Sequence, residues 1–171
     1  MVARIGKIVI GGVALIIVIL IGIGLIAPRE YRGSITRDIP RSPDAIYTWL
    51  TDFEGLPRYR PEISAVEMGG NNAKGFPMWT QFHGKTSSIF QAIEMVTNEH
   101  LAIQTITSNS GLAGTWSYSL SAGSQPGTTS VTITEFSDTY TFLHRIFFTV
   151  LGRKHKLNAE MKALEYWAQG S

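Results

Sequence analysis

Twenty consecutive uncharged, mostly aliphatic residues stand near the start of this chain, at positions 8–27 (IVIGGVALIIVILIGIGLIA). As an α-helix that rises about 1.5 Å per residue, such a run reaches roughly 30 Å, the thickness of the hydrocarbon core of a bilayer. The run predicts a transmembrane helix within an N-terminal segment of residues 1–28. The expected localisation is that of a single-pass membrane protein, with the membrane as a partner.

A secretory signal peptide is the alternative, because Arg4 and Lys7 supply a basic region ahead of the apolar run. Signal-peptide cores are usually about 7–15 residues long and end in a small-x-small cleavage site. A cut after Ala27 would place Leu25, which is not a small residue, at the third position before the cut and Pro28 directly after it. This favours an uncleaved span. More basic residues follow the run than precede it, which favours a cytoplasmic domain, whereas the short basic start favours export. The side of the membrane stays open.

The remaining residues, 29–171, are expected to form one domain of ordinary size, since no shift in composition divides them. The chain has no cysteine, so disulfides and thiolate chemistry are excluded. Its formal charge of +2 comes from scattered basic residues, which argues against a nucleic-acid partner.

Local patterns predict an α+β fold. A strand is expected at residues 31–39 and a helix at 43–51, where Ser42 can cap the helix, Pro43 suits its first position and Asp44 favours its positive end. Six further strands separated by turn residues follow at 63–68, 78–83, 87–96, 101–108, 115–121 and 129–137, and a long helix at 155–169. We therefore expect a curved antiparallel sheet of about seven strands around the C-terminal helix.

Along the last two predicted strands, the side chains alternate between two types, as expected for strands that have one covered face and one face in water. The covered face is expected to carry Trp116, Tyr118 and Leu120 from one strand and Val131, Ile133 and Glu135 from the next. The stripe of the C-terminal helix that includes Met161 and Leu164 is expected to cover it.

Residues 39–59 (IPRSPDAIYTWLTDFEGLPRY) resemble the opening of the polyketide cyclase/dehydrase and lipid-transport (SRPBCC, START-like) superfamily, with a strand, an SPDAIY helix start and DFE-x-x-P-x-Y. Weaker similarities follow in the expected order at 114–120, 129–135 and 157–167. Residues 28–31 (PREY) are similar to those of membrane-anchored bacterial members. The resemblance implies a helix-grip fold that encloses an apolar cavity. It implies no reaction, because the superfamily mixes carriers, cyclases and hydrolases.

A cavity for a hydrophobic ligand needs large apolar side chains on the covered face. The candidates are Trp116, Tyr118, Val131, Ile133, Met161 and Leu164, together with Trp79, Phe82 and Phe90 from middle strands whose facing is ambiguous. Met161 suits variable ligands because its thioether is adaptable. The alternative is that these residues simply fill a solid core.

Glu135 is the most informative polar candidate for this pocket. A carboxyl buried there without a partner would have a raised pKa and could serve as an acid or a base, or bind a hydroxyl group of the ligand. Alternatively, Glu135 reaches solvent at the strand end or pairs with Arg145 or Lys154. The histidines lack metal-ligand spacing, and no nucleophile elbow or phosphate loop occurs, so we assign no catalytic residue, metal or cofactor.

The segment 142–156 (FLHRIFFTVLGRKHK) is apolar in its first part and basic at its end. Phe147 and Phe148 could lie in a membrane interface, with Arg153 and Lys154 drawn to anionic lipids. The alternative is an ordinary helix that covers the end of the sheet.

Taken together, these patterns favour a membrane-anchored binding or transport module for a lipid or another hydrophobic small molecule. One alternative is a cyclase- or dehydratase-type enzyme, in which Glu135, Tyr118 or His83 polarises a polyketide-like or isoprenoid substrate. A weaker alternative is a scaffold for protein partners. Two titratable groups that converge inside the cavity would favour the enzyme.

Overall fold

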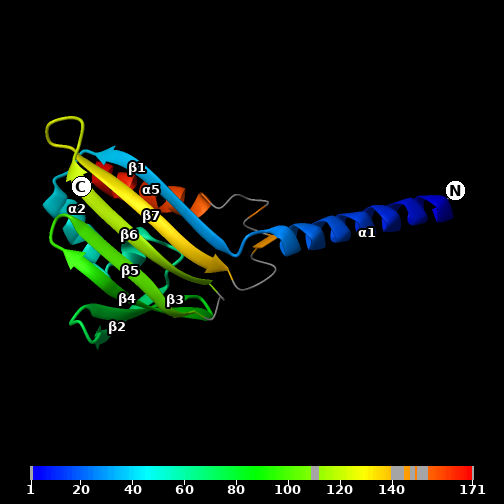
Figure 1. Ribbon diagram of the computed structural model, residues 1–171, viewed down its shortest axis with the longest axis horizontal. Helices are drawn as coiled ribbons and strands as arrows, with labels where there is room; N and C mark the ends of the chain where they lie inside the picture. The colour runs from blue at the N-terminus through cyan, green and yellow to red at the C-terminus, as the bar shows by residue number, and fades with distance from the viewer. Residues whose placement is uncertain (1, 109–111, 140–144, 147–148, 150–153, 171) are drawn as a thin grey trace.

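Seven antiparallel strands form one sheet in the computed structural model, which describes residues 2–108, 112–139, 145, 146, 149 and 154–170. The strands are β1 (Glu30–Ile39), β2 (Ala65–Asn71), β3 (Pro77–His83), β4 (Thr86–Val96), β5 (His100–Ser108), β6 (Leu112–Ala122) and β7 (Thr129–Thr139). Their order is β1-β7-β6-β5-β4-β3-β2, so the last six follow one another as a meander and β1 pairs with β7 (Figure 1). The predicted α+β fold is confirmed.

Two short helices connect β1 to the meander. The helix α2 (Pro43–Thr51) has the predicted bounds, because the Ser42 hydroxyl accepts a hydrogen bond from the Ala45 N–H at 3.3 Å and Pro43 occupies the first turn. The helix α3 (Leu56–Tyr59) is a single turn. The chain thus returns to the sheet at β2 through a proline-interrupted connection, as the sequence suggests.

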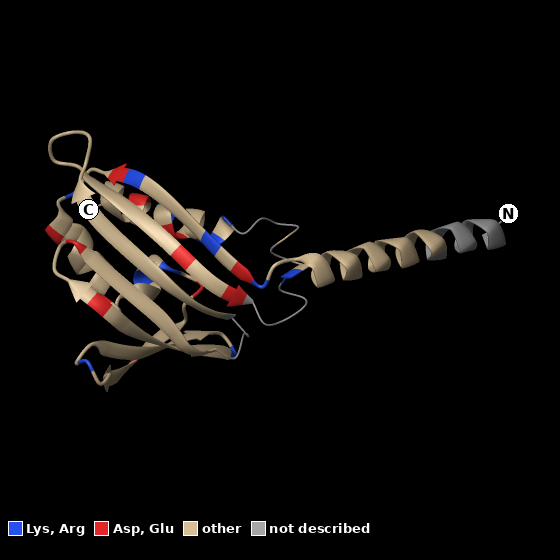
Figure 2. Ribbon diagram, viewed as in Figure 1, with Lys and Arg blue, Asp and Glu red and all other residues tan. Residues whose placement is uncertain are grey.

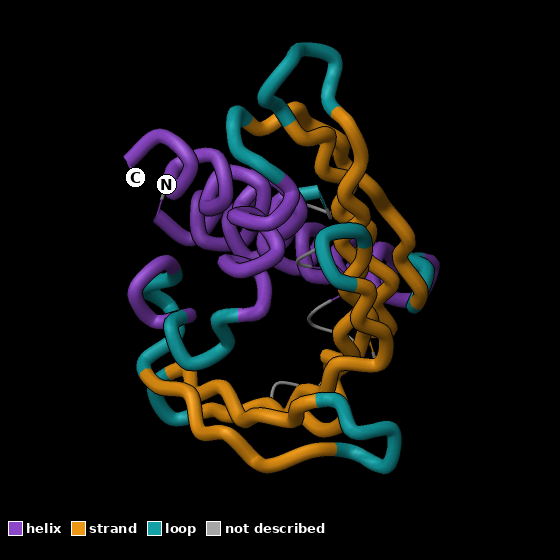
Figure 3. The backbone as a smooth tube through the Cα atoms, turned by 90° about the vertical axis from the view of Figure 1, so that its left-hand side faces the viewer, coloured by secondary structure: helices purple, strands orange, loops and turns teal. Residues whose placement is uncertain are grey.

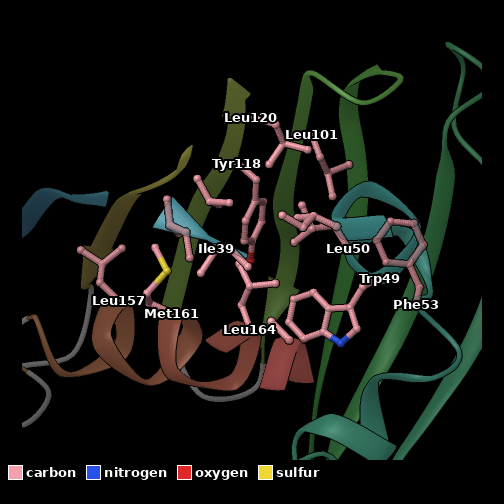
Figure 4. Packing of buried hydrophobic residues seen from close by; sticks show 14 of the residues in the cluster. Ile39, Trp49, Leu50, Phe53, Leu101, Tyr118, Leu120, Leu157, Met161 and Leu164 are labelled. Carbon is pink, nitrogen blue, oxygen red and sulfur yellow. The ribbon is translucent and has the colours of Figure 1, made fainter. Parts of the chain in front are cut away.

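The C-terminal helix α5 (His155–Gly170) lies on the concave side of the bent sheet (Figure 3). Its side chains Leu157, Met161 and Leu164 point toward Ile39 and Tyr118 of the sheet (Figure 4). All five are at most 3% exposed and belong to one hydrophobic cluster. The predicted stripe on the C-terminal helix therefore covers the sheet. Basic and acidic residues are interspersed along the outer strands (Figure 2).

The N-terminal helix α1 (Val2–Ile26) extends away from the sheet (Figure 1). Within the part of the chain that the structure describes, no helix combines the length and hydropathy that a membrane span requires. The predicted transmembrane helix and the predicted localisation as a single-pass membrane protein are therefore wrong.

Gly114 allows β6 to approach β7 closely. A Cβ atom at this position would stand 2.7 Å from the Phe136 carbonyl oxygen and 3.2 Å from the Ser137 Cα, both backbone atoms. Gly114→Ala should therefore lower the free energy of unfolding by about 1–3 kcal/mol, measured by urea denaturation. Gly69→Ala is the matched control, because the nearest atom to its added Cβ is the Met78 carbonyl oxygen at 3.5 Å. Equal effects of the two substitutions would contradict this account.

Candidate ligand site on the concave face of the sheet

Strand register brings the predicted pocket residues of β6 and β7 together. Trp116 lies opposite Glu135, and Tyr118 lies opposite Ile133. On the other side of β6, Ile103 pairs with Trp116 and Leu101 pairs with Tyr118. Because side chains alternate between the faces of a strand, Trp116 and Tyr118 share the concave face with their partners.

Most of the predicted pocket residues are fully buried. The exposed fraction is at most 3% for Trp79, Tyr118, Val131, Ile133, Met161 and Leu164. Trp79 is stacked between Phe53 and Phe90, with ring centroids 3.9 and 5.8 Å away. These residues form the packed floor of the interior.

A second set on the same face is only partly covered. We define it as the open patch, which comprises Phe90, Ile103, Thr105, Gly114 and Trp116. Thr105 lies opposite Phe90, and Ile103 lies opposite Trp116, so the patch spans β4, β5 and β6. The apolar side chains of the open patch pack against the core but are only partly buried, so some of their apolar surface is left uncovered.

Some predicted site residues lie elsewhere. Phe82 alternates with the buried Trp79 and Gln81 along β3, so it faces the opposite side of the sheet. Phe147, Phe148 and Arg153 fall outside the described residues. Lys154 is exposed and helps line a surface hollow of about 350 Å³ between β1 and α5.

A buried polar cluster joins three separate elements. Oε1 of Glu160, on α5, accepts a hydrogen bond of 2.7 Å from the Tyr118 hydroxyl on β6 and another from the guanidinium of Arg60, which follows α3. We call these three residues the Arg60 cluster. The side chains of Arg60 and Glu160 are 18% and 9% exposed, so the ion pair lies inside the protein.

Sequence reasoning missed Arg60 and Glu160. Glu160 follows Leu157 by three residues and precedes Leu164 by four, which is the spacing of the apolar stripe itself. That spacing was an available signal for a buried carboxylate. Arg60 carries no comparable signal, because its partner is 100 residues further along the chain.

Burial raises the pKa of Tyr118 well above its ordinary value, and the neighbouring Glu160 carboxylate raises it further. The folded protein therefore holds the phenolic proton more tightly than the unfolded chain does. This contribution to stability is fully present below about pH 10 and is lost as the pH rises through the folded pKa.

Tyr118→Phe should therefore flatten the alkaline fall in stability between about pH 10 and 11, measured by urea unfolding. Tyr166→Phe is the matched control, because Tyr166 is 82% exposed on α5. Parallel alkaline curves for wild type and Tyr118→Phe would refute the assignment.

Glu135 and Lys156 form a second group of titratable residues at the interior. Glu135 is 2% exposed. Burial lowers the pKa of Lys156, in the first turn of α5, and the carboxylate of Glu135 raises it. The two groups of opposite charge thus interact, and Glu135 lies opposite Trp116 on the neighbouring strand. His83, in contrast, places its Nδ1 atom 3.1 Å from the Glu62 carbonyl oxygen.

Within the described residues, no group of three or more potential metal ligands is placed to hold an ion. The functional groups described on the helix side of the sheet are aromatic rings, the Arg60 cluster with its ion pair and phenol, and the charged groups of Glu135 and Lys156.

Comparison with known proteins gives a family and a fold. Residues 32–155 match the model of a family described as polyketide cyclase / dehydrase and lipid transport. The fold is similar to that of a START superfamily protein from Mycobacterium smegmatis, with a TM-score of 0.66 and 15% identity over 81% of this chain and 97% of that one. No curated protein matches the chain significantly.

Two further solved structures share the fold. The Zhui aromatase/cyclase from Streptomyces sp. R1128 has a TM-score of 0.68 and 12% identity over 82% of this chain and 94% of that one. Norcoclaurine synthase from Thalictrum flavum has a TM-score of 0.61 and 14% identity over 87% of this chain and 92% of that one. At such low identity these likenesses concern the architecture alone.

Proposed function

Because the chain belongs to the polyketide cyclase / dehydrase and lipid transport family, we propose that it binds a lipid or another hydrophobic small molecule between the sheet and α5. The observation that carries this proposal is the open patch. Its apolar side chains face the helix side of the sheet and are nevertheless only partly buried in the folded chain. Covering them with a ligand would remove apolar surface from water, which is worth about 25 cal/mol per Å².

The proposed ligand lies flat against Trp116 and Phe90. An aromatic wall of this kind offers a large apolar area and tolerates ligands of varied shape. The fully buried residues Trp79, Tyr118, Val131, Ile133, Met161 and Leu164 form the floor beneath it. Met161 adds an adaptable surface on the helix side.

The test is a fluorescence titration of the whole chain with N-phenyl-1-naphthylamine, a neutral apolar dye. We expect saturable binding of one dye per chain. Trp116→Ala should weaken it roughly tenfold or more, because the indole ring supplies much of the apolar contact area. Tyr166→Ala removes an exposed aromatic ring from α5 and should leave the dissociation constant unchanged. A linear, non-saturable response, or equal effects of the two substitutions, would reject the proposal.

An enzyme of cyclase or dehydratase type is the second candidate, supported by the proximity of Glu135 and Lys156. In such a reaction the Glu135 carboxylate would take a proton from a carbon next to a ketone, and that carbon would bond to a second carbonyl carbon while the C=O π bond opens to an alkoxide, which would take a proton from the Lys156 ammonium group. The neutral Lys156 amine would then take the second proton from the attacking carbon, and the hydroxyl would leave as water with the proton held by Glu135, so that a C=C bond forms and both side chains return to their starting states. The test is incubation with a synthetic poly-β-ketone thioester. Cyclised, dehydrated product with wild type and none with Glu135→Gln would support the enzyme, provided that the variant still binds the dye. Identical product yields would reject it.

A further inference from the structure

Three nitrogen donors of the interior have no hydrogen-bond acceptor among the described residues. They are Arg60 Nε, Trp49 Nε1 and Trp79 Nε1. Each of these groups can donate a hydrogen bond and cannot accept one. A buried donor without a partner is costly and rare in folded proteins, so each such group requires an explanation. A ligand that brings an acceptor oxygen would provide one.

Arg60 is the one of these three donors that belongs to a polar cluster joined to the sheet. Its guanidinium contacts Glu160, which also accepts from the hydroxyl of Tyr118. Tyr118 lies two residues from Trp116 on the same face of β6, a separation of roughly 7 Å along the strand. Tyr118 of the Arg60 cluster is therefore a same-face neighbour of Trp116 in the open patch.

The charge of the Arg60 cluster restricts the chemistry of that ligand. The positive guanidinium is already matched by the Glu160 carboxylate, and Tyr118 is a neutral phenol. Glu160 would repel a ligand carboxylate. Arg60 would repel a ligand ammonium group, which also offers no acceptor atom to Arg60 Nε. A neutral acceptor avoids both penalties.

Building on the proposed function, we infer that the ligand carries a neutral carbonyl oxygen that accepts a hydrogen bond from Arg60 Nε, while its apolar body covers the open patch. The ligand class is thus an apolar ketone, ester or amide. Plain hydrocarbons, carboxylates and amines are disfavoured. The carbonyl supplies the acceptor that the chain itself lacks at this nitrogen.

The experiment uses three probes of similar size and shape in competition with N-phenyl-1-naphthylamine on the whole chain: 2-acetylnaphthalene, 2-ethylnaphthalene and 2-naphthoate. Its readout is the affinity of the ketone divided by that of the hydrocarbon, which cancels the shared apolar contact. The variant Arg60→Met combined with Glu160→Gln removes the donor, leaves no buried charge and keeps an acceptor for Tyr118. We expect this ratio to fall roughly tenfold in the variant. Arg58→Met, an exposed neighbour on α3, should leave it unchanged.

The outcomes separate this inference from the proposed function. Saturable dye binding with the same ratio in wild type and in the double variant would overturn the role of Arg60 and leave the binding module standing. Tightest binding of 2-naphthoate by the wild type would overturn the choice of a neutral acceptor. Absence of saturable dye binding in every protein would instead refute the proposed function itself.

Discussion

Arg60→Met should lower the free energy of unfolding by about 3–5 kcal/mol at pH 7, because it leaves the buried carboxylate of Glu160 without its cation. Glu160 is 8% exposed, so water compensates little for the lost partner. Urea denaturation at pH 7 measures the loss.

Two controls accompany this prediction. Combining Arg60→Met with Glu160→Gln removes the stranded charge and should recover most of the lost stability, because a neutral partner still accepts from Tyr118. Arg58→Met should change stability by no more than about 0.5 kcal/mol, as substitutions at exposed positions usually do. If the double variant is as unstable as the single one, packing of the arginine stem and not its charge holds the cluster together.

Thr105→Phe should weaken binding of N-phenyl-1-naphthylamine roughly 50- to 100-fold. The new ring would lie opposite Phe90 in the open patch and exclude about 100 Å² of apolar ligand surface, worth about 2.5 kcal/mol. Thr105 is half-buried, so we expect the substitution to preserve the fold. The same fluorescence titration measures the dissociation constant.

Thr107→Phe is the matched control for the blocked patch. It makes the same substitution on the same strand at an exposed residue, which pairs with the exposed Ile89. Its affinity for the dye should equal that of the wild type. Equal binding by Thr105→Phe and the wild type, with both proteins folded by circular dichroism, would place the dye site elsewhere.

Much of the fold could be predicted from local sequence, because the deciding interactions are local. The Ser42–Pro43 pair defines the start of α2, and the alternation in β6 and β7 identified Trp116, Tyr118 and Glu135 as residues of one face. The family followed from the motif around α2 and is confirmed by the match to residues 32–155.

Other features depend on register and distant pairing. Phe82 lies one residue out of phase with Trp79 and Gln81, a difference that composition alone does not reveal in a strand with large residues on both faces. The contact between Arg60 and Glu160 requires α5 to lie across the sheet, which no local pattern fixes. The membrane prediction rested on hydropathy and length together, and no described helix meets both requirements.

Native mass spectrometry of the whole chain as purified from cells, compared with the Thr105→Phe variant, tests the central claim most directly. If the concave face of the sheet holds a hydrophobic small molecule, the wild type should carry one discrete adduct that organic solvent extracts, and the variant should be bare. An adduct of the same mass on both proteins, or no adduct and no saturable dye binding on the wild type, would contradict a ligand site at the open patch.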